Sequence, residues 1–156
     1  MEVIHPVDRQ IIELLQADGR MSFVDMAARI GVTEGTIRRR FNQLREAGLI
    51  RIAAIADPFA VGFETAAFFG LRVDTADIES VVRELVALPE VHYVAAATGE
   101  YDVVARAYFA NNQELADFVL RKLSKIQGIR EINSSLLLRI YKRSYTWGVA
   151  LPSSRS

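Results

Sequence analysis

Apolar side chains recur at helical spacing through the first fifty residues of the chain, with polar side chains between them. The stretches with this spacing are residues 7–17, 22–30 and 33–47. Ser22 and Thr33 suit the N-cap of the second and third stretches, and Gly48 suits the position after the third. The buried stripe expected in the third stretch is Ile37, Phe41 and Leu44. The pattern therefore predicts three short helices, each with one apolar face.

The second and third expected helices are spaced as in a helix-turn-helix. Gly31 and Val32 alone separate them. Ala27 is small enough for two helices to cross closely, Gly31 permits a left-handed turn, and Ile37 is an apolar anchor for the later helix. These residues in register predict a helix-turn-helix, whose second helix enters the major groove of DNA.

The pattern changes after Gly48. Residues 49–55 carry mostly β-branched and small apolar side chains, which predicts a short strand, and Asp57 with Pro58 closes it. We therefore expect residues 51–63 to form a strand and linker between two domains.

A weak internal repeat with an offset of 38 positions occupies most of the remaining chain and aligns Val81 with Val119 and Leu85 with Leu123. Each copy predicts a strand, an amphipathic helix and a strand. The ranges are 67–73, 77–88 and 91–97, then 102–109, 113–126 and 129–140. Two such units give the βαββαβ order of a ferredoxin-like domain. Both helices would cover one sheet face, and the apolar other face predicts dimerisation by sheet packing.

These elements predict an α+β chain, and 156 residues suffice for two small domains. Residues 1–50 are expected to form a helix-turn-helix, winged-helix-like domain, and residues 51–63 the strand and linker. Residues 64–143 are expected to form a ferredoxin-like domain for regulation and dimerisation, and residues 144–156 a C-terminal tail.

Composition narrows the class of protein. The chain is 51% hydrophobic and 24% charged and has no cysteine, which is typical of a globular protein and excludes disulfides and thiolate metal sites. The N-terminus has no basic segment followed by an apolar one, and no run of eighteen apolar residues occurs. We therefore expect a cytoplasmic protein without a membrane span.

The net charge of zero does not favour nucleic acid as a partner, but the distribution of charge does. Residues 33–51 contain five arginines and two glutamates, and guanidinium groups suit contacts with phosphate and guanine. The residues expected to contact double-stranded DNA are Ser22, Thr33, Glu34, Thr36, Arg38, Arg39, Arg40 and Arg51. Charge runs are usually solvated helix faces, so it is the helix-turn-helix spacing that favours DNA. Arg40 also lies near the buried stripe, where a structural role competes.

Residues 98–102 read Thr-Gly-Glu-Tyr-Asp and join the central strands of the repeat. The spacing alone favours a hairpin turn, where Gly and Asp are common. The alternative is a ligand loop, in which backbone N–H groups near Gly99 meet a carboxylate, Thr98 offers a hydroxyl, and Asp102 meets an ammonium group. Catalysis is not indicated, because His5 and His92 fall in different domains and no phosphate loop or nucleophile motif occurs. We therefore expect that the protein is not an enzyme and binds no metal or cofactor.

Four segments of the chain resemble the leucine-responsive regulatory protein/AsnC (Lrp/AsnC) family of transcriptional regulators. They are DRQIIELLQADGR from Asp8, TxxTIRRRFxxLxxAGLI from Thr33, Asp57-Pro58 with Gly62, and TGEYD from Thr98. The resemblance implies a sequence-specific DNA-binding regulator whose ferredoxin-like half dimerises through its sheets, and in some members assembles to tetramers or octamers. It also implies an amino-acid effector, with contacts at Thr98, Gly99, Glu100, Tyr101 and Asp102.

Two positions depart from the common pattern of the family, since Arg45 stands where an acidic residue is frequent and Asp57 where asparagine is. Two other functions stay open at this point. One is a metabolite-sensing interaction module whose helix-turn-helix contacts only protein. The other is an allosteric subunit of an amino-acid enzyme. The arginine-bearing helix argues against both.

Overall fold

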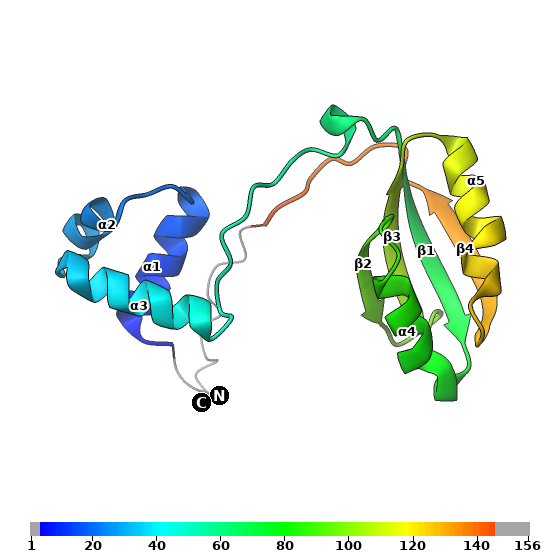
Figure 1. The fold of residues 1–156 in the computed structure, drawn as a ribbon, viewed down its shortest axis with the longest axis horizontal. Helices are drawn as coiled ribbons and strands as arrows, with labels where there is room; N and C mark the ends of the chain where they lie inside the picture. Colours follow the sequence, from blue (N-terminus) through cyan, green and yellow to red (C-terminus); the bar gives the residue numbers. More distant parts are fainter. Residues whose placement is uncertain (1–3, 146–156) are drawn as a thin grey trace. The chain divides into compact units, whose positions relative to one another are not determined.

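The computed structural model describes residues 4–145, and the chain divides into two compact units, each with its own core (Figure 1). Of the described residues, one unit comprises 4–54 with 142–145, and the other comprises 55–141. The expected tail, 144–156, lies almost entirely outside the described residues. Between residues 4 and 145, no helix is long and apolar enough to cross a membrane.

Three helices form the first unit: α1 (Pro6–Ala17), α2 (Phe23–Ile30) and α3 (Glu34–Glu46). The second and third begin where the sequence predicts, because the Ser22 hydroxyl accepts the Asp25 N–H at 3.1 Å and Thr33 Oγ1 accepts the Thr36 N–H at 3.2 Å. Gly31 adopts φ 81°, the left-handed turn that ends α2. The predicted helix-turn-helix is confirmed.

The core of this unit is small and draws on all three helices. Its buried residues are Ile11, Ile12, Met26, Ala27, Ile37 and Leu44. Phe41 also belongs to the expected stripe of α3 but is only half-buried. Its ring lies 5.1 Å from that of Phe23 at the start of α2. The aromatic pair therefore extends the core to the surface between α2 and α3.

The short strand expected over residues 49–55 is not formed, and this prediction is wrong. Residues 50–57 adopt neither helix nor strand, and Ile52 and Ile55 are 52% and 60% exposed. A strand is stabilised by hydrogen bonds to a neighbouring strand. The four strands that the structure describes all pair within the other unit, so the apolar residues here have β propensity but no partner.

The second unit is built on a four-stranded antiparallel sheet with the order β2-β3-β1-β4. The strands are β1 (Thr65–Val73), β2 (Val91–Ala96), β3 (Val103–Phe109) and β4 (Ile129–Leu136). The helices that connect them are α4 (Ile78–Val86) and α5 (Asn112–Arg121). This is the ferredoxin-like βαββαβ order, so the predicted fold class is confirmed. The last strand ends at Leu136 rather than at 140, and α5 is continued by a short 3-10 turn, Leu123–Lys125.

Both helices cover the same face of the sheet, as expected (Figure 1). Alternate residues of β1 and β3 point to this face, because side chains alternate along a strand. The buried set from these strands is Ala67, Phe69, Leu71, Val73, Val103, Ala105, Ala107 and Phe109. Phe118 of α5 completes this core, with its ring 5.5 Å from Phe69 and 5.1 Å from Phe109.

No described α-helix covers the opposite face of the sheet, which we call the open face. It carries the other alternate residues of the two central strands: Ala66, Phe68, Gly70, Val104, Arg106 and Tyr108. Part of it is covered by aromatic side chains of the same unit, since Phe59 and Phe63 lie 6.3 and 6.2 Å from the Tyr108 ring. The face is therefore smaller and less open than the sequence suggests, although its centre around Phe68 and Val104 remains half-exposed.

Candidate DNA-binding helix and effector loop

The exposed side of α3 carries two of the expected DNA contacts as a joined pair. Arg38 Nη2 lies 2.6 Å from Glu34 Oε1, one helical turn earlier, and the two side chains are 61% and 44% exposed. The Arg38 guanidinium also lies over the Phe23 ring, with Cζ 5.2 Å from the ring centroid. Arg38 is therefore held from two sides while it remains accessible.

Arg39 lies beside this pair and is held only loosely. Its one described bond runs from Nη1 to Gln43 Oε1 at 3.5 Å, the limit of a hydrogen bond, and the side chain is exposed. Its charge is not neutralised by a described carboxylate. Arg39 can therefore reach outward as a free cation.

Two of the three expected hydroxyl contacts, Ser22 and Thr33, are helix N-caps, and the third, Thr36, bonds to the Thr33 cap. Ser22 Oγ donates to Asp25 Oδ2 at 2.7 Å, besides accepting its N–H, and Thr33 Oγ1 lies 2.9 Å from Thr36 Oγ1. Ser22 and Thr33 are exposed, whereas Thr36 is half-buried. These hydroxyls fix where α2 and α3 begin and keep the first turn of α3 at the surface.

Arg40 and Arg51 lie apart from the other expected contacts. Arg40 Nη1 donates to Asp8 Oδ1 of α1 at 3.0 Å, and both side chains are only 18% exposed. The Arg40 guanidinium thus ties α3 to α1, as its position near the stripe suggested, and is not available for DNA. Arg51 is exposed on the segment that follows α3.

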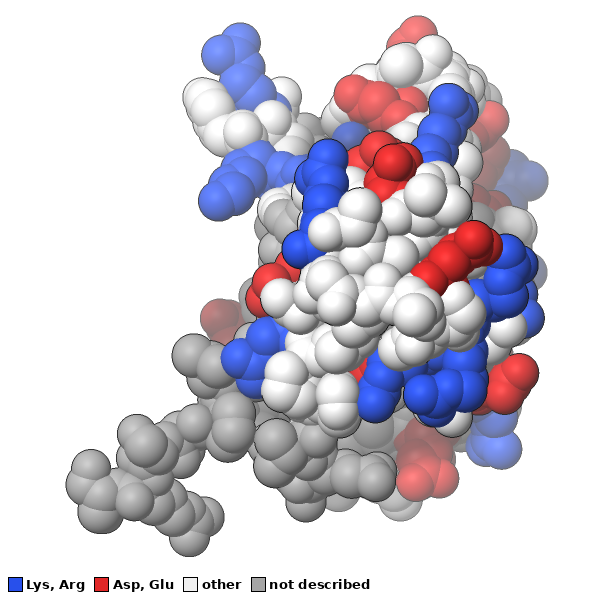
Figure 2. Space-filling model, turned by 90° about the vertical axis from the view of Figure 1, so that its left-hand side faces the viewer, with Lys and Arg blue, Asp and Glu red and all other residues white. Residues whose placement is uncertain are grey.

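The charge around α3 is mixed. Figure 2 shows the molecule from the side of this unit, where basic groups surround a largely uncharged area and acidic groups lie among them. This agrees with a net charge of zero. Attraction to DNA must therefore come from individually placed arginines more than from a broad basic field.

The loop between β2 and β3 contains the five expected effector residues. Gly99 adopts φ 115°, which favours glycine, and Thr98, Gly99 and Glu100 are exposed. Tyr101 instead turns back onto the open face, where a Cβ added to Gly70 would come within 2.5 Å of its ring. Gly70 is therefore needed for the ring to lie flat on β1.

Partial burial against the sheet, and then the carboxylate of Glu100, raise the pKa of Tyr101 above its ordinary value. The Glu131 carboxylate acts in the same direction. A tyrosine phenol is protonated at neutral pH even at its ordinary pKa, so Tyr101 is a hydrogen-bond donor at the base of the loop.

Asp102 is built into the sheet and does not project from the loop. Its Oδ2 accepts the Val73 N–H at 2.9 Å, and its own N–H donates to the Leu71 carbonyl at 3.0 Å. The Val73 bond lies where the register of β1 with β4 shifts, so the carboxylate satisfies an N–H that the sheet leaves over. The structure thus gives Asp102 a positioning role, whereas the sequence suggested an ammonium partner.

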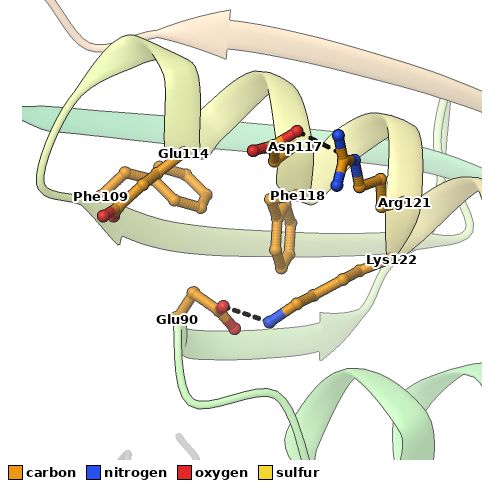
Figure 3. Close-up of a pocket in the computed structure, with 7 residues that line it drawn as sticks. All are labelled: Glu90, Phe109, Glu114, Asp117, Phe118, Arg121 and Lys122. Atoms are coloured by element: carbon orange, nitrogen blue, oxygen red, sulfur yellow. Dashed lines mark hydrogen bonds and ion pairs between the residues drawn. The ribbon is translucent and has the colours of Figure 1, made fainter.

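A separate hollow of about 280 Å³ lies at the other end of β2, between the strand and α5 (Figure 3). Its charged groups already pair with one another: Lys122 Nζ with Glu90 Oε1 at 2.5 Å, and Arg121 with Asp117 at 3.1 Å. Partial burial raises the pKa of Glu90, but the bonds from Lys122 and from its own N–H outweigh this, and the net shift is downward. The hollow therefore offers a ligand few unpaired charges.

Three features of these regions were not predicted from the sequence. Phe23 was not expected beside Arg38, Tyr101 was not expected over Gly70, and the hollow at Glu90 was not expected at all. Each joins residues that no local pattern connects. The glycine at position 70, inside a strand, was the one sequence signal for a close approach.

Together the capped helix-turn-helix, the exposed arginines of α3 and the separate ferredoxin-like unit define a DNA-binding transcriptional regulator. Family models support this class directly. The AsnC-type helix-turn-helix domain matches residues 6–45, and the Lrp/AsnC ligand binding domain matches residues 66–147. The chain belongs to the Lrp/AsnC family, which confirms the resemblance seen in the sequence.

Relatives of this chain are regulators and not enzymes. An HTH-type transcriptional regulator of Pyrococcus abyssi is 41% identical over 92% of this chain and 89% of that protein. The regulator FL11 of Pyrococcus furiosus is 32% identical over 91% of this chain and 94% of that protein. The chain is accordingly placed among transcriptional regulators.

Solved structures have the same fold over nearly the full length. Escherichia coli AsnC is 26% identical with a TM-score of 0.82, covering 91% of this chain and 97% of that one. A transcriptional regulator of Neisseria meningitidis, solved as its L-Met complex, is 27% identical with a TM-score of 0.83, covering 96% and 97%.

Proposed function

We propose that this regulator binds a specific operator as a homodimer in the cytoplasm and that a free amino acid controls it. The observation that carries the proposal is the exposed first half of α3, where capped and partly pre-ordered side chains project from a helix-turn-helix. The proposed DNA contacts are Ser22, Thr33, Glu34, Thr36, Arg38, Arg39 and Arg51.

Four of these contacts suit the phosphate groups of DNA. Arg39 and Arg51 are exposed and carry unneutralised charge, so they suit phosphates, which take most contacts in protein–DNA interfaces. Ser22 and Thr33 lie at helix N-termini, where hydroxyls and N–H groups also meet phosphate. Such contacts position α3 in the groove and make binding depend on salt.

Arg39→Ala tests the DNA-binding surface. We expect weaker binding to every sequence, because a phosphate contact carries no sequence information. The slope of log K against log salt should fall by about 0.9 per contact, so by about 1.8 for a dimer. Fluorescence anisotropy at several salt concentrations measures both quantities.

The matched control is Arg83→Ala, which removes an exposed arginine from α4 of the regulatory unit. It should leave the slope unchanged. If the wild-type protein does not bind DNA, or binds it with an affinity that does not depend on salt, the proposed function is contradicted and a module that contacts only protein is favoured.

The proposed effector site is the exposed part of the loop between β2 and β3. Thr98, Gly99 and Glu100 are exposed to a ligand, whereas Tyr101 and Asp102 hold the loop on the sheet. The Neisseria meningitidis relative was solved with L-Met, and that supports an amino acid as the chemical class. L-methionine is accordingly the first probe, followed by the other amino acids.

Substitution of Asp102 by alanine and by asparagine separates two roles for this residue. Asp102→Ala leaves the Val73 N–H without its partner and should lower the free energy of unfolding of the regulatory unit by about 1–3 kcal/mol. Asp102→Asn keeps an acceptor oxygen and should cost less. Thermal unfolding with and without L-methionine, or a better amino acid from the panel, measures both stability and ligand response.

A positioning role predicts that Asp102→Asn retains the ligand-induced rise in Tm. Loss of that rise in a stably folded Asp102→Asn protein would instead show that the carboxylate charge meets the ammonium group.

The proposed dimer interface is the open face of the sheet. Phe68 and Val104 are half-exposed at its centre, and no described helix covers them. A second copy of the same face would bury this apolar area in a two-fold arrangement. Tetramers or octamers would require further contacts beyond this face.

A further inference from the structure

We infer that Glu34 and Arg38 act together as the specificity-determining pair of α3 and recognise one G·C base pair, with Phe23 as a positioning residue. This inference rests on the proposed DNA-binding function and names the base pair that the helix reads. The observations behind it are the geometry of the pair, its contact with Phe23, its charge, and the glycine next to Arg38 on the helix.

The ion pair itself does little for stability. Glu34 and Arg38 are joined at 2.6 Å, yet both are largely exposed. Exposed pairs one turn apart on a helix contribute only marginally to folding. A short contact at this exposed site therefore fixes the orientation of two side chains more than it stabilises the unit.

Phe23 adds a second restraint on Arg38. The guanidinium lies 5.2 Å from the Phe23 ring centroid, and that ring lies 5.1 Å from Phe41, beside the core. The Phe23 ring is thus anchored, and the Arg38 guanidinium packs against its face. Because the side chain is ordered before DNA arrives, less rotamer entropy is lost when it binds.

The charge of the pair favours base edges over phosphate. Glu34 and Arg38 together carry no net charge, and a phosphate would repel the carboxylate. In the major groove, guanine presents two acceptors, O6 and N7, and cytosine presents the N4 donor beside them. Arg38 keeps free N–H groups for guanine, and Glu34 Oε2 remains to accept from cytosine N4, so the pair complements a G·C pair.

Gly35 permits a close approach at this point. It lies inside the first turn of α3, and a Cβ added there would meet nothing within 4 Å. Its φ is not positive, so neither backbone conformation nor internal packing requires glycine. Glycine is unfavourable inside a helix. At about 100° per residue Gly35 lies beside Arg38 on the helix surface, on the side away from Glu34, so the missing side chain leaves a low surface next to the guanidinium on which a base pair can approach.

The test compares wild-type protein with Arg38→Ala and Glu34→Gln on an operator selected from random DNA with the wild-type protein. Each G·C pair of the half-site is replaced by A·T, and Kd is measured by anisotropy at fixed salt. For wild type, one replacement should weaken binding roughly 5- to 150-fold. Arg38→Ala should lose this discrimination at that one position and keep it elsewhere.

Glu34→Gln should lower discrimination at the same position but raise affinity for non-cognate DNA, because Arg38 is no longer neutralised. Arg45→Ala, which removes another exposed arginine from the end of α3, is the matched control and should keep the wild-type discrimination. Circular dichroism of each variant checks that the helices remain folded.

Two outcomes would overturn the inference while leaving the proposed function intact. One is an Arg38→Ala protein that discriminates at every G·C pair as wild type does but binds all sequences more weakly. The other is a selected half-site in which replacement of any G·C pair leaves the Kd of the wild-type protein unchanged. A wild-type protein that prefers no sequence would overturn the proposed function itself.

Discussion

Phe118→Ala is expected to lower the free energy of unfolding of the regulatory unit by about 3–5 kcal/mol and to leave the helix-turn-helix unit unaffected. Phe118 is 2% exposed and joins α5 to the sheet through Phe69 and Phe109. Alanine would leave a cavity that neighbouring rings cannot fill without moving. The effect stays local because the two units have separate buried clusters.

Hydrogen exchange followed by mass spectrometry measures this prediction, since peptides from the two units report separately. Exchange should accelerate across β1, β3 and α5 and stay unchanged across α1 to α3. Tyr141→Ala removes an aromatic side chain that is 88% exposed and should change stability by less than about 0.5 kcal/mol. Equal acceleration in both units would mean that they unfold as one cooperative body.

Val104→Asp is expected to convert the proposed dimer into a monomer and to weaken operator binding by about 100-fold or more, because two linked heads gain affinity from avidity. Val104 pairs with Gly70 of β1 and Ala95 of β2 and is half-exposed on the open face. In the apolar centre of an interface, an aspartate would lose its hydration, which costs several kcal/mol.

Light scattering coupled to size exclusion measures the mass, and anisotropy measures binding to DNA with one or two half-sites. Val86→Asp, at a position 65% exposed on α4, is the control and should leave both unchanged. Binding to a single half-site should survive Val104→Asp. A Val104→Asp protein that remains dimeric would show that the open face is not the interface.

Local signals in the sequence predicted the helix-turn-helix well. The caps at Ser22 and Thr33 and the turn at Gly31 depend on atoms within three residues, so the pattern contains the interactions that form them. The βαββαβ order was likewise predictable, because strand and helix periodicities alternate along the repeat.

Long-range partners were not predictable in the same way. Asp8 and Val73 determine the roles of Arg40 and Asp102, yet they lie 32 and 29 positions away. The strand expected at residues 49–55 failed for the same reason, since its formation requires a neighbour that no local pattern specifies. The residue type at a position thus indicates which interactions its side chain can make, and the fold determines which of them form.

The segment 51–56, which forms neither helix nor strand, also has a consequence for how related regulators diverge. An extended chain gains at most about 3.3–3.6 Å per residue, which is close to the rise of one base pair in DNA. Insertion or deletion of one residue in this segment, which lies beyond Ile50, disturbs no strand pairing and neither buried cluster. The reach between the two units can therefore lengthen or shorten during evolution in steps of about one base-pair rise, without any change to the sensor or to the reading head.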